Sequence, residues 1–439
     1  MKRSERIHSP TGDVERRLWE VAERSGAPDA MPRRTLLALA ALGGAGIALP
    51  ACKADPPPEA KGGAAGPAKQ APSPSRSAEA VGRSEAIVKP TPDADFIKYG
   101  SANAEARLER VWERGLITPV SLFYVRNHAS TPVIDAKTWK LRVHGSGLER
   151  PFELTYDDLL RLPSKTVTRY LECAGNGRAF FKELLQREAE GDQWRLGAFG
   201  VAEWTGVPLS EILGRAGVKK SAVAVMPVGL DKEEFQRPLP IAKAMEEDTL
   251  LAYRMNGEDL PADHGSPARV LVPGWAGAAS VKWVGRIEVS DTPLFVKMNT
   301  TSYVLIGPDY APEPPAEGPA VTLQAVKSAV ALPWGAKLRA GRNVARGYAW
   351  SPNGTIARVD VSLNGGKSWK PAELVGPNLP RAGVRWELPF EAEAGEMTIS
   401  PRATDEAGNR QPDLSQQRWN KKGYLFGAVV PHPVSIVPG

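Results

Sequence analysis

The sequence of 439 residues contains only two cysteines, Cys52 and Cys173. A zinc site built from cysteine and an iron–sulfur cluster both need more thiolates than this, so both are excluded. A covalently bound c-type haem is excluded as well, because no Cys-x-x-Cys-His run occurs. Cys52 stands at the end of an apolar segment near the N-terminus. Cys173 is therefore the single thiol expected in the folded part of the chain.

Histidine and basic clusters are scarce as well. None of the five histidines has the helical spacing of a metal site, so a histidine metal centre is not expected. The net charge of +6 arises from scattered Lys and Arg without interleaved aromatics, which argues against a nucleic-acid groove but leaves room for a local pocket for a small anion. A hydrophobic content of 42% is typical of a globular protein, and the 40 prolines and 42 glycines indicate a β-rich architecture.

The apolar run near the N-terminus, Leu36 to Leu49, is short for a transmembrane span and has the length of a signal-peptide core. It follows Arg33 and Arg34, which resemble a twin-arginine export signal. That route exports proteins already folded, which suits a non-covalent cofactor inserted before export. Leu49-Pro50-Ala51-Cys52 resembles a lipoprotein cleavage site, so lipidation of Cys52 is expected. The alternative interpretation of the run is a buried core helix.

The length predicts two folded domains plus tails. The predicted regions are an N-terminal extension and signal over 1–52, a disordered tether over 53–91, a first domain over 92–320 and a second domain over 321–439. The tether is rich in Ala, Pro, Gly, Ser and Lys and cannot bury a core.

The first domain shows a mixed α+β pattern without regular βαβ alternation. Helices are expected at Asp157–Leu162, Ala179–Glu188, Leu209–Ala216 and Ile241–Met245. Strands are expected at Trp139–Val143, Val167–Leu171, Ala222–Val228, Ala268–Val272 and Gly285–Val289. In the second domain Val359, Val361 and Leu363 alternate with polar residues, and Asn364-Gly365 predicts a tight hairpin turn. Met397–Thr404 is a further strand, and the whole pattern favours an all-β immunoglobulin-like sandwich.

Cys173 lies in RYLECAGNGRAFF, directly after a predicted strand. A thiolate at a strand end, followed by glycines and by Arg178, is positioned for metal ligation or nucleophilic work. The AGNG run allows a ligand to approach the backbone closely. The alternative is a buried, inert cysteine.

Two further clusters carry polar groups. YVRNH places Arg126, Asn127 and His128 on one short segment, and DHGSPARVLVPGWAGAASVKW sets basic groups among Gly and Pro, as a loop around an anionic, ring-bearing ligand requires. Taken singly, the first cluster could be a surface loop and the basic residues of the second could be solvated charges.

These clusters belong to a longer ordered set of motifs. The set runs from about residue 118 to the C-terminus and reads FYVRNH, WKLRVHG, YLECAGNGR, WTGVPL, LAYRMNG, LPADHGSPARVLVPG, VKWVGRIEV, GYAW, RVDVSLNGGKSW, QPD and WNKKGY. The set resembles the sulfite oxidase family of molybdenum enzymes. The resemblance implies an α+β molybdopterin-binding catalytic domain followed by an immunoglobulin-like dimerisation domain.

The resemblance also assigns roles to individual residues. Cys173 matches the thiolate ligand of molybdenum, a soft donor that suits this metal. The residues that match molybdopterin-binding positions are Tyr124, Arg126, Asn127, His128, Asp231, His264, Arg269, Ser280, Val281 and Lys282. Those that match the sulfite pocket are Arg126, Arg178, Trp194, Tyr303 and Lys422; the match of Tyr303 rests mainly on its spacing from Lys282.

The implied activity is periplasmic sulfite dehydrogenase. Sulfite would be oxidised to sulfate at a molybdenum–molybdopterin cofactor, and electrons would pass to a separate acceptor, a c-type cytochrome being expected because no haem motif is present. The implied assembly is a homodimer, although some relatives pair with a cytochrome subunit. Membrane contact is expected only through the lipid anchor.

One departure from the family leaves the substrate open. Lys422 stands where many relatives have arginine, and lysine keeps the charge but loses the planar fork. The molybdenum subunit of sulfur-oxidising complexes, which acts on protein-bound sulfane sulfur, is the alternative. Two others remain: a lipid-anchored binding protein with a degenerate site, and a reductase that uses the same cofactor.

Overall fold

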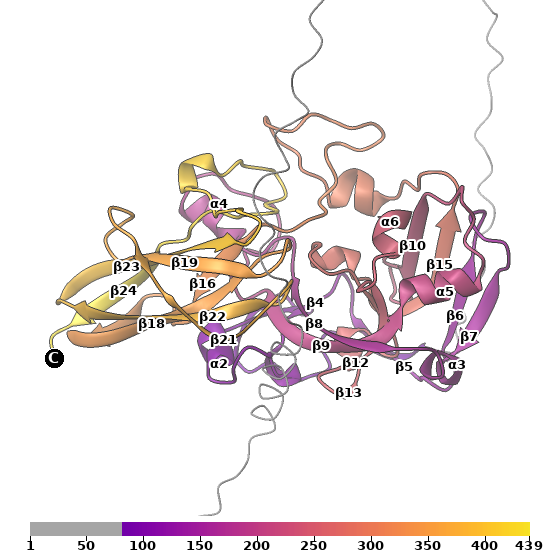
Figure 1. The fold of residues 1–439 in the computed structure, drawn as a ribbon, viewed down its shortest axis with the longest axis horizontal. Coiled ribbons are helices and arrows are strands. Elements are labelled where there is room, and N and C mark those ends of the chain that lie inside the picture. The colour runs from indigo at the N-terminus through magenta and orange to yellow at the C-terminus, as the bar shows by residue number, and fades with distance from the viewer. Residues whose placement is uncertain (1–80) are drawn as a thin grey trace, which may run out of the picture.

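The computed structural model describes residues 81–439 (Figure 1). The predicted export signal, the lipidation site Cys52 and residues 53–80 of the predicted tether lie outside the described residues. Within the described part of the chain, no helix is both long enough and apolar enough to cross a membrane.

The first domain is built on two sheets, one mixed and one antiparallel. One has the strand order β11 (Leu239–Pro240), β10 (Ala224–Gly229), β15 (Val284–Ser290), β6 (Lys140–His144) and β7 (Phe152–Thr155). The other has the order β13 (Glu258–Asp259), β12 (Leu250–Met255), β9 (Phe199–Pro208) and β8 (Lys165–Glu172), with β14 (Arg269–Leu271) also paired to β12. Smaller sheets join β2 (Phe96–Tyr99), β3 (Asn103–Ala106) and β4 (Val125–Arg126), and β1 (Val81–Glu85) with β5 (Thr131–Ile134).

Short helices connect these strands. They are α2 (Leu108–Trp112), α3 (Tyr156–Leu160), α4 (Ala179–Glu183), α5 (Leu209–Arg215) and α6 (Ile241–Ala244). Single turns of other helix types are η1 (Val120–Leu122), η2 (Ala262–His264), η3 (Gly277–Ala279), η4 (Met298–Ser302) and η5 (Leu414–Gln416). α3 begins at a capping box, in which the Thr155 hydroxyl accepts from the Asp158 amide and the Asp158 carboxylate accepts from the Thr155 amide.

The second domain is a sandwich of two sheets. One sheet has the order β16 (Lys327–Val330), β18 (Gly341–Trp350), β22 (Gly383–Ala392) and β21 (Glu373–Leu379). The other has the order β17 (Ala336–Arg339), β24 (His432–Val437), β23 (Gly395–Asp405), β19 (Ile356–Ser362) and β20 (Lys370–Pro371). Val359, Trp386 and Ile399 are fully buried between them. The predicted α+β domain followed by an immunoglobulin-like sandwich is confirmed.

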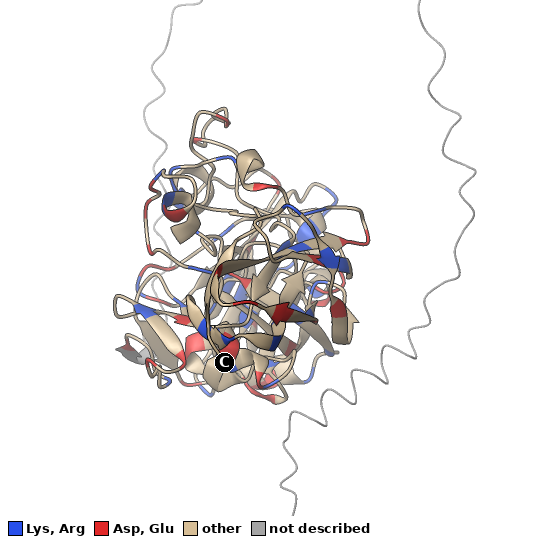
Figure 2. Cartoon of the chain, turned by 90° about the vertical axis from the view of Figure 1, so that its left-hand side faces the viewer, with Lys and Arg blue, Asp and Glu red and all other residues tan. Residues whose placement is uncertain are grey.

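The two domains lie side by side (Figure 1). The ring of Trp350 in β18 stacks on Phe199 of β9, with centroids 3.9 Å apart. Figure 2, which views the molecule from the side of the sandwich, shows Lys and Arg interspersed with Asp and Glu rather than gathered by sign. The small net charge is therefore not concentrated in one patch on this face.

The predicted disordered tether extends too far toward the first domain. β1 pairs with β5, and the backbone amides of Val88 and Lys89 donate to the carboxylate of Asp263. The prediction of disorder is wrong for residues 81–91. This segment has few apolar side chains to bury, but its backbone forms hydrogen bonds to the edge of β5 and to the Asp263 carboxylate, and these hydrogen bonds order it.

Two other expectations were wrong in detail. α4 ends at Glu183 rather than Glu188, because the backbone of Gln186 adopts a φ of 55° and turns the chain back. The expected tight turn at Asn364-Gly365 is part of a longer loop between β19 and β20. There the Ser362 hydroxyl accepts from the Gly366 amide and Asn364 Oδ1 accepts from the Ser368 amide, which stabilises the wider turn.

Candidate active site

Cys173 directly follows β8, and its thiol lies where two hollows of the first domain meet. Its backbone is fixed on both sides, since its amide donates to the Ala198 carbonyl at 2.9 Å and its carbonyl accepts from the Asn176 amide at 3.0 Å. The Gly175 amide lies 3.4 Å from Cys173 Sγ and donates to it. Cys173 is buried and is not in a disulfide.

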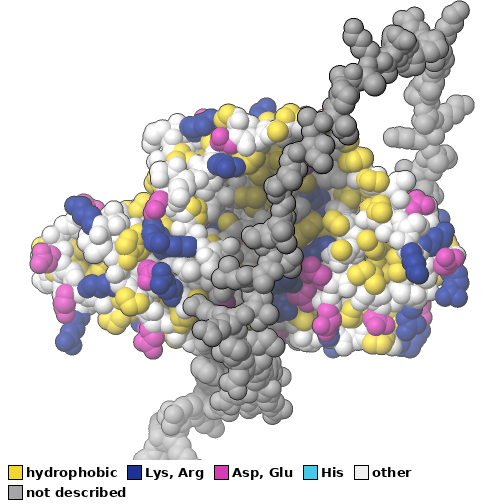
Figure 3. All heavy atoms as spheres, turned by 45° about the horizontal axis from the view of Figure 1, so that its top comes forward, with side chains coloured by type: hydrophobic (Ala, Val, Ile, Leu, Met, Phe, Trp, Pro, Cys, Tyr) yellow, Lys and Arg dark blue, Asp and Glu magenta, His cyan; other side chains and the backbone are white. Residues whose placement is uncertain are grey.

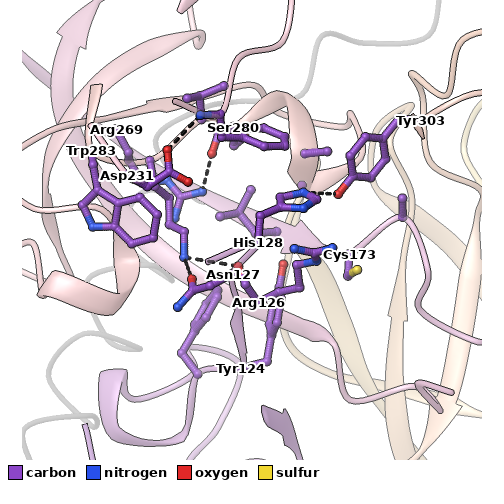
Figure 4. Close-up of a pocket in the computed structure, with 18 residues that line it drawn as sticks. Tyr124, Arg126, Asn127, His128, Cys173, Asp231, Arg269, Ser280, Trp283 and Tyr303 are labelled. Carbon is purple, nitrogen blue, oxygen red and sulfur yellow. Dashed lines mark hydrogen bonds between the residues drawn. The ribbon is translucent and has the colours of Figure 1, made fainter. Parts of the chain in front are cut away.

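The two hollows share Arg126, Cys173 and Tyr303. The inner hollow, about 700 Å³, is lined by Phe123, Tyr124, Arg126, Asn127, His128, Leu171, Cys173, Ala174, Asp231, Phe235, Arg269, Gly277, Ala278, Ser280, Val281, Lys282, Trp283 and Tyr303 (Figure 4). The outer hollow, about 730 Å³, is lined by Arg126, Cys173, Arg178, Glu190, Gly191, Asp192, Trp194, Tyr303, Lys422 and Tyr424. In the space-filling view, hydrophobic side chains gather in and around a hollow on the upper face of the molecule (Figure 3).

Two cations of the inner hollow are held by backbone carbonyls and an amide. Arg269 donates to the carbonyls of His264 (3.0 Å) and Ser280 (2.8 Å). Lys282 donates to the Asp263 carbonyl at 2.8 Å and to the side-chain oxygen of Asn127. Burial lowers the pKa of Arg269 to about 10. Burial, and next the charge of Arg269, lower the pKa of Lys282 well below its usual value. Desolvation makes it costly to keep these two buried side chains charged, and a bound anion would offset that cost. The arrangement therefore indicates an anion-binding site.

Buried donors without partners support the same conclusion. Arg269 Nε and Arg126 Nη1 are both buried and make no hydrogen bond within the described part of the chain. A bound anion in the inner hollow would satisfy them. Flat walls complete the hollow, because Phe235 and Trp283 line it together with Tyr124. The donor set and the walls fit a phosphate-bearing pterin.

A hydrogen bond joins the inner hollow to the outer one. His128 Nε2 lies 2.8 Å from the hydroxyl oxygen of Tyr303, and the imidazole stacks on Phe235 with ring centroids 4.5 Å apart (Figure 4). Burial, and next the charges of Arg126 and Lys282, lower the pKa of His128 to about 2. Burial also raises the pKa of Tyr303 above its usual value. The pair therefore stays neutral at physiological pH, as imidazole and phenol.

Arg178 is the best-fixed cation of the outer hollow. Its Nε donates to the Lys422 carbonyl at 2.9 Å and its Nη1 to the Asp192 carbonyl at 2.7 Å. Glycines make room for it: a Cβ on Gly175 would lie 2.4 Å from Nη2 and one on Gly191 3.0 Å from Nη1. Gly175 was expected to admit a ligand to the backbone, and the structure shows that it admits the guanidinium of Arg178 instead.

The rim of the outer hollow is a cluster of charges. Lys422 Nζ lies 2.9 Å from the carboxylate of Glu190, which Lys421 also approaches at 3.3 Å. The hydrogen bond from Lys422 lowers the pKa of Glu190. Farther in, the rings of Tyr303 and Tyr424 stack at 5.3 Å. The hollow thus combines three cations with a wall of phenols.

The structure brings together almost all of the residues singled out from the sequence. Every predicted sulfite-pocket residue lines the outer hollow, and the buried ring of Trp194 forms part of its wall. Tyr124, Asn127, Asp231, Ser280 and Val281 line the inner hollow with the groups described above.

His264 is the exception among the predicted pterin-binding residues. It does not line either hollow and lies behind Phe123, with the two ring centroids 5.3 Å apart. Its side chain is buried, and burial lowers its pKa well below the usual value. Its Nε2 is buried and makes no hydrogen bond within the described part of the chain, so contact between His264 and the pterin stays a prediction.

Other lining residues were not foreseen. Tyr424 closes the WNKKGY motif and Trp283 closes VKW, so both lay within recognised motifs and could have been found there. Asp192 and Phe235 lie in stretches without a motif, and no sequence signal marks them.

Comparison with known proteins agrees with this arrangement. Residues 128–296 match the model of the oxidoreductase molybdopterin binding domain, and residues 320–430 match that of the Mo-co oxidoreductase dimerisation domain. The first match contains most of the inner hollow, and the second spans most of the sandwich.

Individual relatives are sulfite-oxidising enzymes by name. Mitochondrial sulfite oxidase of Mus musculus is 37% identical over 354 residues, which are 76% of this chain and 64% of that one. Sulfite oxidase of Gallus gallus is 38% identical over 345 residues, 74% of each chain. The chain thus spans slightly less than two thirds of the length of the mouse enzyme.

Among solved structures, the sulfane dehydrogenase SoxCD from Paracoccus pantotrophus is similar, with a TM-score of 0.68 and 32% identity. The match covers 76% of this chain and 85% of that one. Sequence, fold and pocket chemistry agree, and the chain belongs to the sulfite oxidase family of molybdenum–molybdopterin oxidoreductases.

Proposed function

We propose that the protein is a sulfite dehydrogenase, which oxidises sulfite to sulfate and passes the electrons to a separate acceptor such as a c-type cytochrome. One observation carries the proposal: Arg126, Arg178 and Lys422 line the hollow onto which Cys173 opens. A small oxyanion must exchange its hydration for such charge-assisted hydrogen bonds when it enters a protein.

The inner hollow would hold the molybdopterin. Arg269 and Lys282 would bind its phosphate, and Arg126 would contact it near Cys173, whose thiolate would be the protein ligand of the metal. When bound, the molybdenum–molybdopterin group supplies the oxygen-atom transfer and the two-electron redox chemistry. The protein supplies position and charge.

The outer hollow would bind and orient the substrate. The guanidinium of Arg178 is held in place by the carbonyls of Asp192 and Lys422, so it costs little reorganisation when the anion arrives. The Tyr303 hydroxyl can form a hydrogen bond to an oxygen of the bound anion, and its hydrogen bond with the neutral imidazole of His128 fixes its position.

Export and assembly are part of the same proposal. Arg33 and Arg34 would direct twin-arginine export to the periplasm, and lipidated Cys52 would anchor the protein to a membrane. The sandwich would form a homodimer, which the match to a dimerisation domain supports.

The direct test is sulfite-dependent reduction of ferricyanide by the purified protein, after its molybdenum content has been measured. Turnover in the parent and at least about a 10³-fold lower rate in Cys173→Ser, equivalent to about 4 kcal/mol of activation free energy, is expected. A molybdenum-loaded parent without sulfite turnover would contradict the proposal.

A second candidate is oxidation of protein-bound sulfane sulfur. The outer hollow shares Glu190 and Gly191 with an open surface hollow of about 820 Å³ that also includes Trp419 and Lys421. Such an approach has room for a thiol-bearing segment of a carrier protein, and the similarity to a sulfane dehydrogenase supports it. Faster turnover with a protein persulfide than with sulfite would favour this candidate.

A further inference from the structure

An ion pair that spans the two domains lies directly behind Cys173. Glu172 is the last residue of β8 and Lys327 is the first residue of β16 in the sandwich. Lys327 Nζ lies 2.6 Å from Glu172 Oε1, and the two side chains are 1% and 0% exposed. Because the desolvation of two charges offsets most of their attraction, a buried pair is a weak source of stability. Its location next to the Cys173 thiol therefore says more about its role than its contribution to stability does.

Both members of the ion pair form further hydrogen bonds. Glu172 also accepts from Asn176 Nδ2 and from the indole N–H of Trp350, both at 2.9 Å. Lys327 donates in addition to the backbone carbonyl of Asn176 at 3.0 Å. Glu172 and Asn176 flank the turn that contains Cys173. The ion pair therefore fixes both ends of this turn to the sandwich.

The backbone of the turn is held from the same side. Gln324 Nε2 lies 3.0 Å from the Glu172 carbonyl and 3.3 Å from the Cys173 carbonyl and donates to both. Asn176 Oδ1 accepts from the Ala198 amide at 3.1 Å. Within this fixed turn the Gly175 amide points at the Cys173 sulfur. The direction of the thiol and its hydrogen bond both follow from the turn.

We infer that Lys327, through Glu172 and Asn176, positions the Cys173 thiolate toward the metal, so that the sandwich domain is part of the scaffold of the active site. The inference rests on the proposed function, in which Cys173 binds molybdenum. Groups behind a ligand orient it and adjust its donation to the metal. Lys327 and Glu172 are positioning residues, since neither lines either hollow.

The test compares four variants of the molybdenum-loaded full chain. Lys327→Met leaves the Glu172 carboxylate unpaired, Lys327→Arg keeps the charge, and Glu172→Gln combined with Lys327→Met removes both charges. Arg381→Met is the matched control, because Arg381 of the sandwich pairs with Asp248 of the first domain at 3.2 Å without contacting the Cys173 turn. Each variant is assayed for molybdenum and pterin content, for the optical absorption of the thiolate–molybdenum bond and for sulfite kinetics.

In Lys327→Met and in the double variant, we expect a shifted thiolate–molybdenum absorption and a kcat lower by about 10- to 100-fold. The sulfite KM should stay near that of the parent, because Arg126, Arg178 and Lys422 are unchanged. Lys327→Arg should recover most of kcat. Arg381→Met should keep the absorption and kcat of the parent, even if it unfolds at a lower temperature.

Parent-like absorption and kcat in either folded Lys327→Met variant would overturn the inference. So would loss of folding in all variants at Lys327, including the charge-neutral double variant, because the pair would then serve folding alone. Failure of the proposed function is a separate result: a molybdenum-loaded parent without sulfite turnover contradicts that proposal, while the absorption of the variants still tests the positioning of Cys173.

Discussion

The inner and outer hollows meet at Cys173 but hold their charges in different ways. In the inner hollow the cations Arg269 and Lys282 have pKa values lowered chiefly by burial, and backbone carbonyls bind them. In the outer hollow Arg178 is also buried and bound by carbonyls, whereas Lys422 at the rim pairs with the exposed carboxylate of Glu190.

This contrast indicates two kinds of ligand. A cofactor that stays bound can repay the cost of buried charges once, during assembly. A substrate that comes and goes needs at least one charge that solvent and a counter-ion can satisfy between turnovers, as Glu190 does for Lys422. The inner hollow is therefore suited to permanent occupancy and the outer hollow to exchange.

The largest effect is expected for the inner hollow. Arg269→Met should lower the affinity for molybdopterin by about 100-fold, because charge-assisted hydrogen bonds are lost. Molybdenum and pterin per chain measure this. Arg269→Lys keeps the charge but loses the planar guanidinium, so its affinity for molybdopterin should lie between those of Arg269→Met and the parent. Parent-like pterin content in Arg269→Met would mean that the inner hollow is not the cofactor site.

In the outer hollow, Arg178→Met should raise the KM for sulfite by about 10- to 30-fold and leave the pterin content unchanged. Steady-state kinetics at saturating ferricyanide measure the KM. Lys421→Met is the control, since Lys421 is half exposed and pairs only with the rim carboxylate of Glu190. Loss of pterin from Arg178→Met would mean that Arg178 helps to bind the cofactor, so the two hollows would not serve separate ligands.

Acid should destabilise the inner hollow through His128. Its pKa is lowered to about 2 in the folded protein, against 6.5 for an ordinary histidine, so below pH 6.5 the unfolded chain takes up a proton that the folded chain does not. The contribution of the neutral imidazole to the free energy of unfolding is therefore complete above pH 6.5 and is lost as the pH falls below it.

In the cofactor-free protein, His128→Gln should reduce the loss of unfolding free energy between pH 7 and pH 4 by about 1–2 kcal/mol, a value discounted for partial exposure. Urea unfolding at several pH values measures it. An unchanged pH profile would show that the imidazole is charged in the folded state. His432, whose pKa burial lowers to about 4, should account for part of the remaining pH dependence.

The smallest effect is expected at the rim. Lys422→Arg offers a planar fork in place of an ammonium group and should lower the KM for sulfite by about two- to threefold. The assay is that used for Arg178→Met. A rise in KM of tenfold or more would mean that the lysine is adapted to another substrate and would favour the sulfane-sulfur candidate.

Much of the fold could be predicted because its strands carry a local pattern. β6, β8, β10 and β15 were all expected within a few residues of their bounds, since apolar residues alternate or run continuously there between turns. The ends of elements were less predictable. Residues 81–91 join the first domain through backbone hydrogen bonds to Asp263, which no side-chain pattern signals.

Site residues that lie in family motifs could be predicted from the sequence. Contacts that depend on how distant segments pack could not. Arg126, Cys173 and Lys282 lie far apart in sequence, and the family motifs identified all three. His264 shares a motif with Arg269, yet the turn at Gly265, with a φ of 108°, leaves it behind Phe123. The pairing of Glu172 with Lys327 spans 155 residues and depends on how two domains pack, so nothing local in the sequence announces it.

The most direct test of the whole account is X-ray absorption at the molybdenum K-edge of the purified parent and of Cys173→Ser. Both hollows meet at Cys173, so its sulfur should be a ligand of the metal. Molybdenum in the parent should have one more sulfur neighbour than molybdenum in the variant. Equal numbers of sulfur neighbours in two proteins that both contain molybdenum would contradict it.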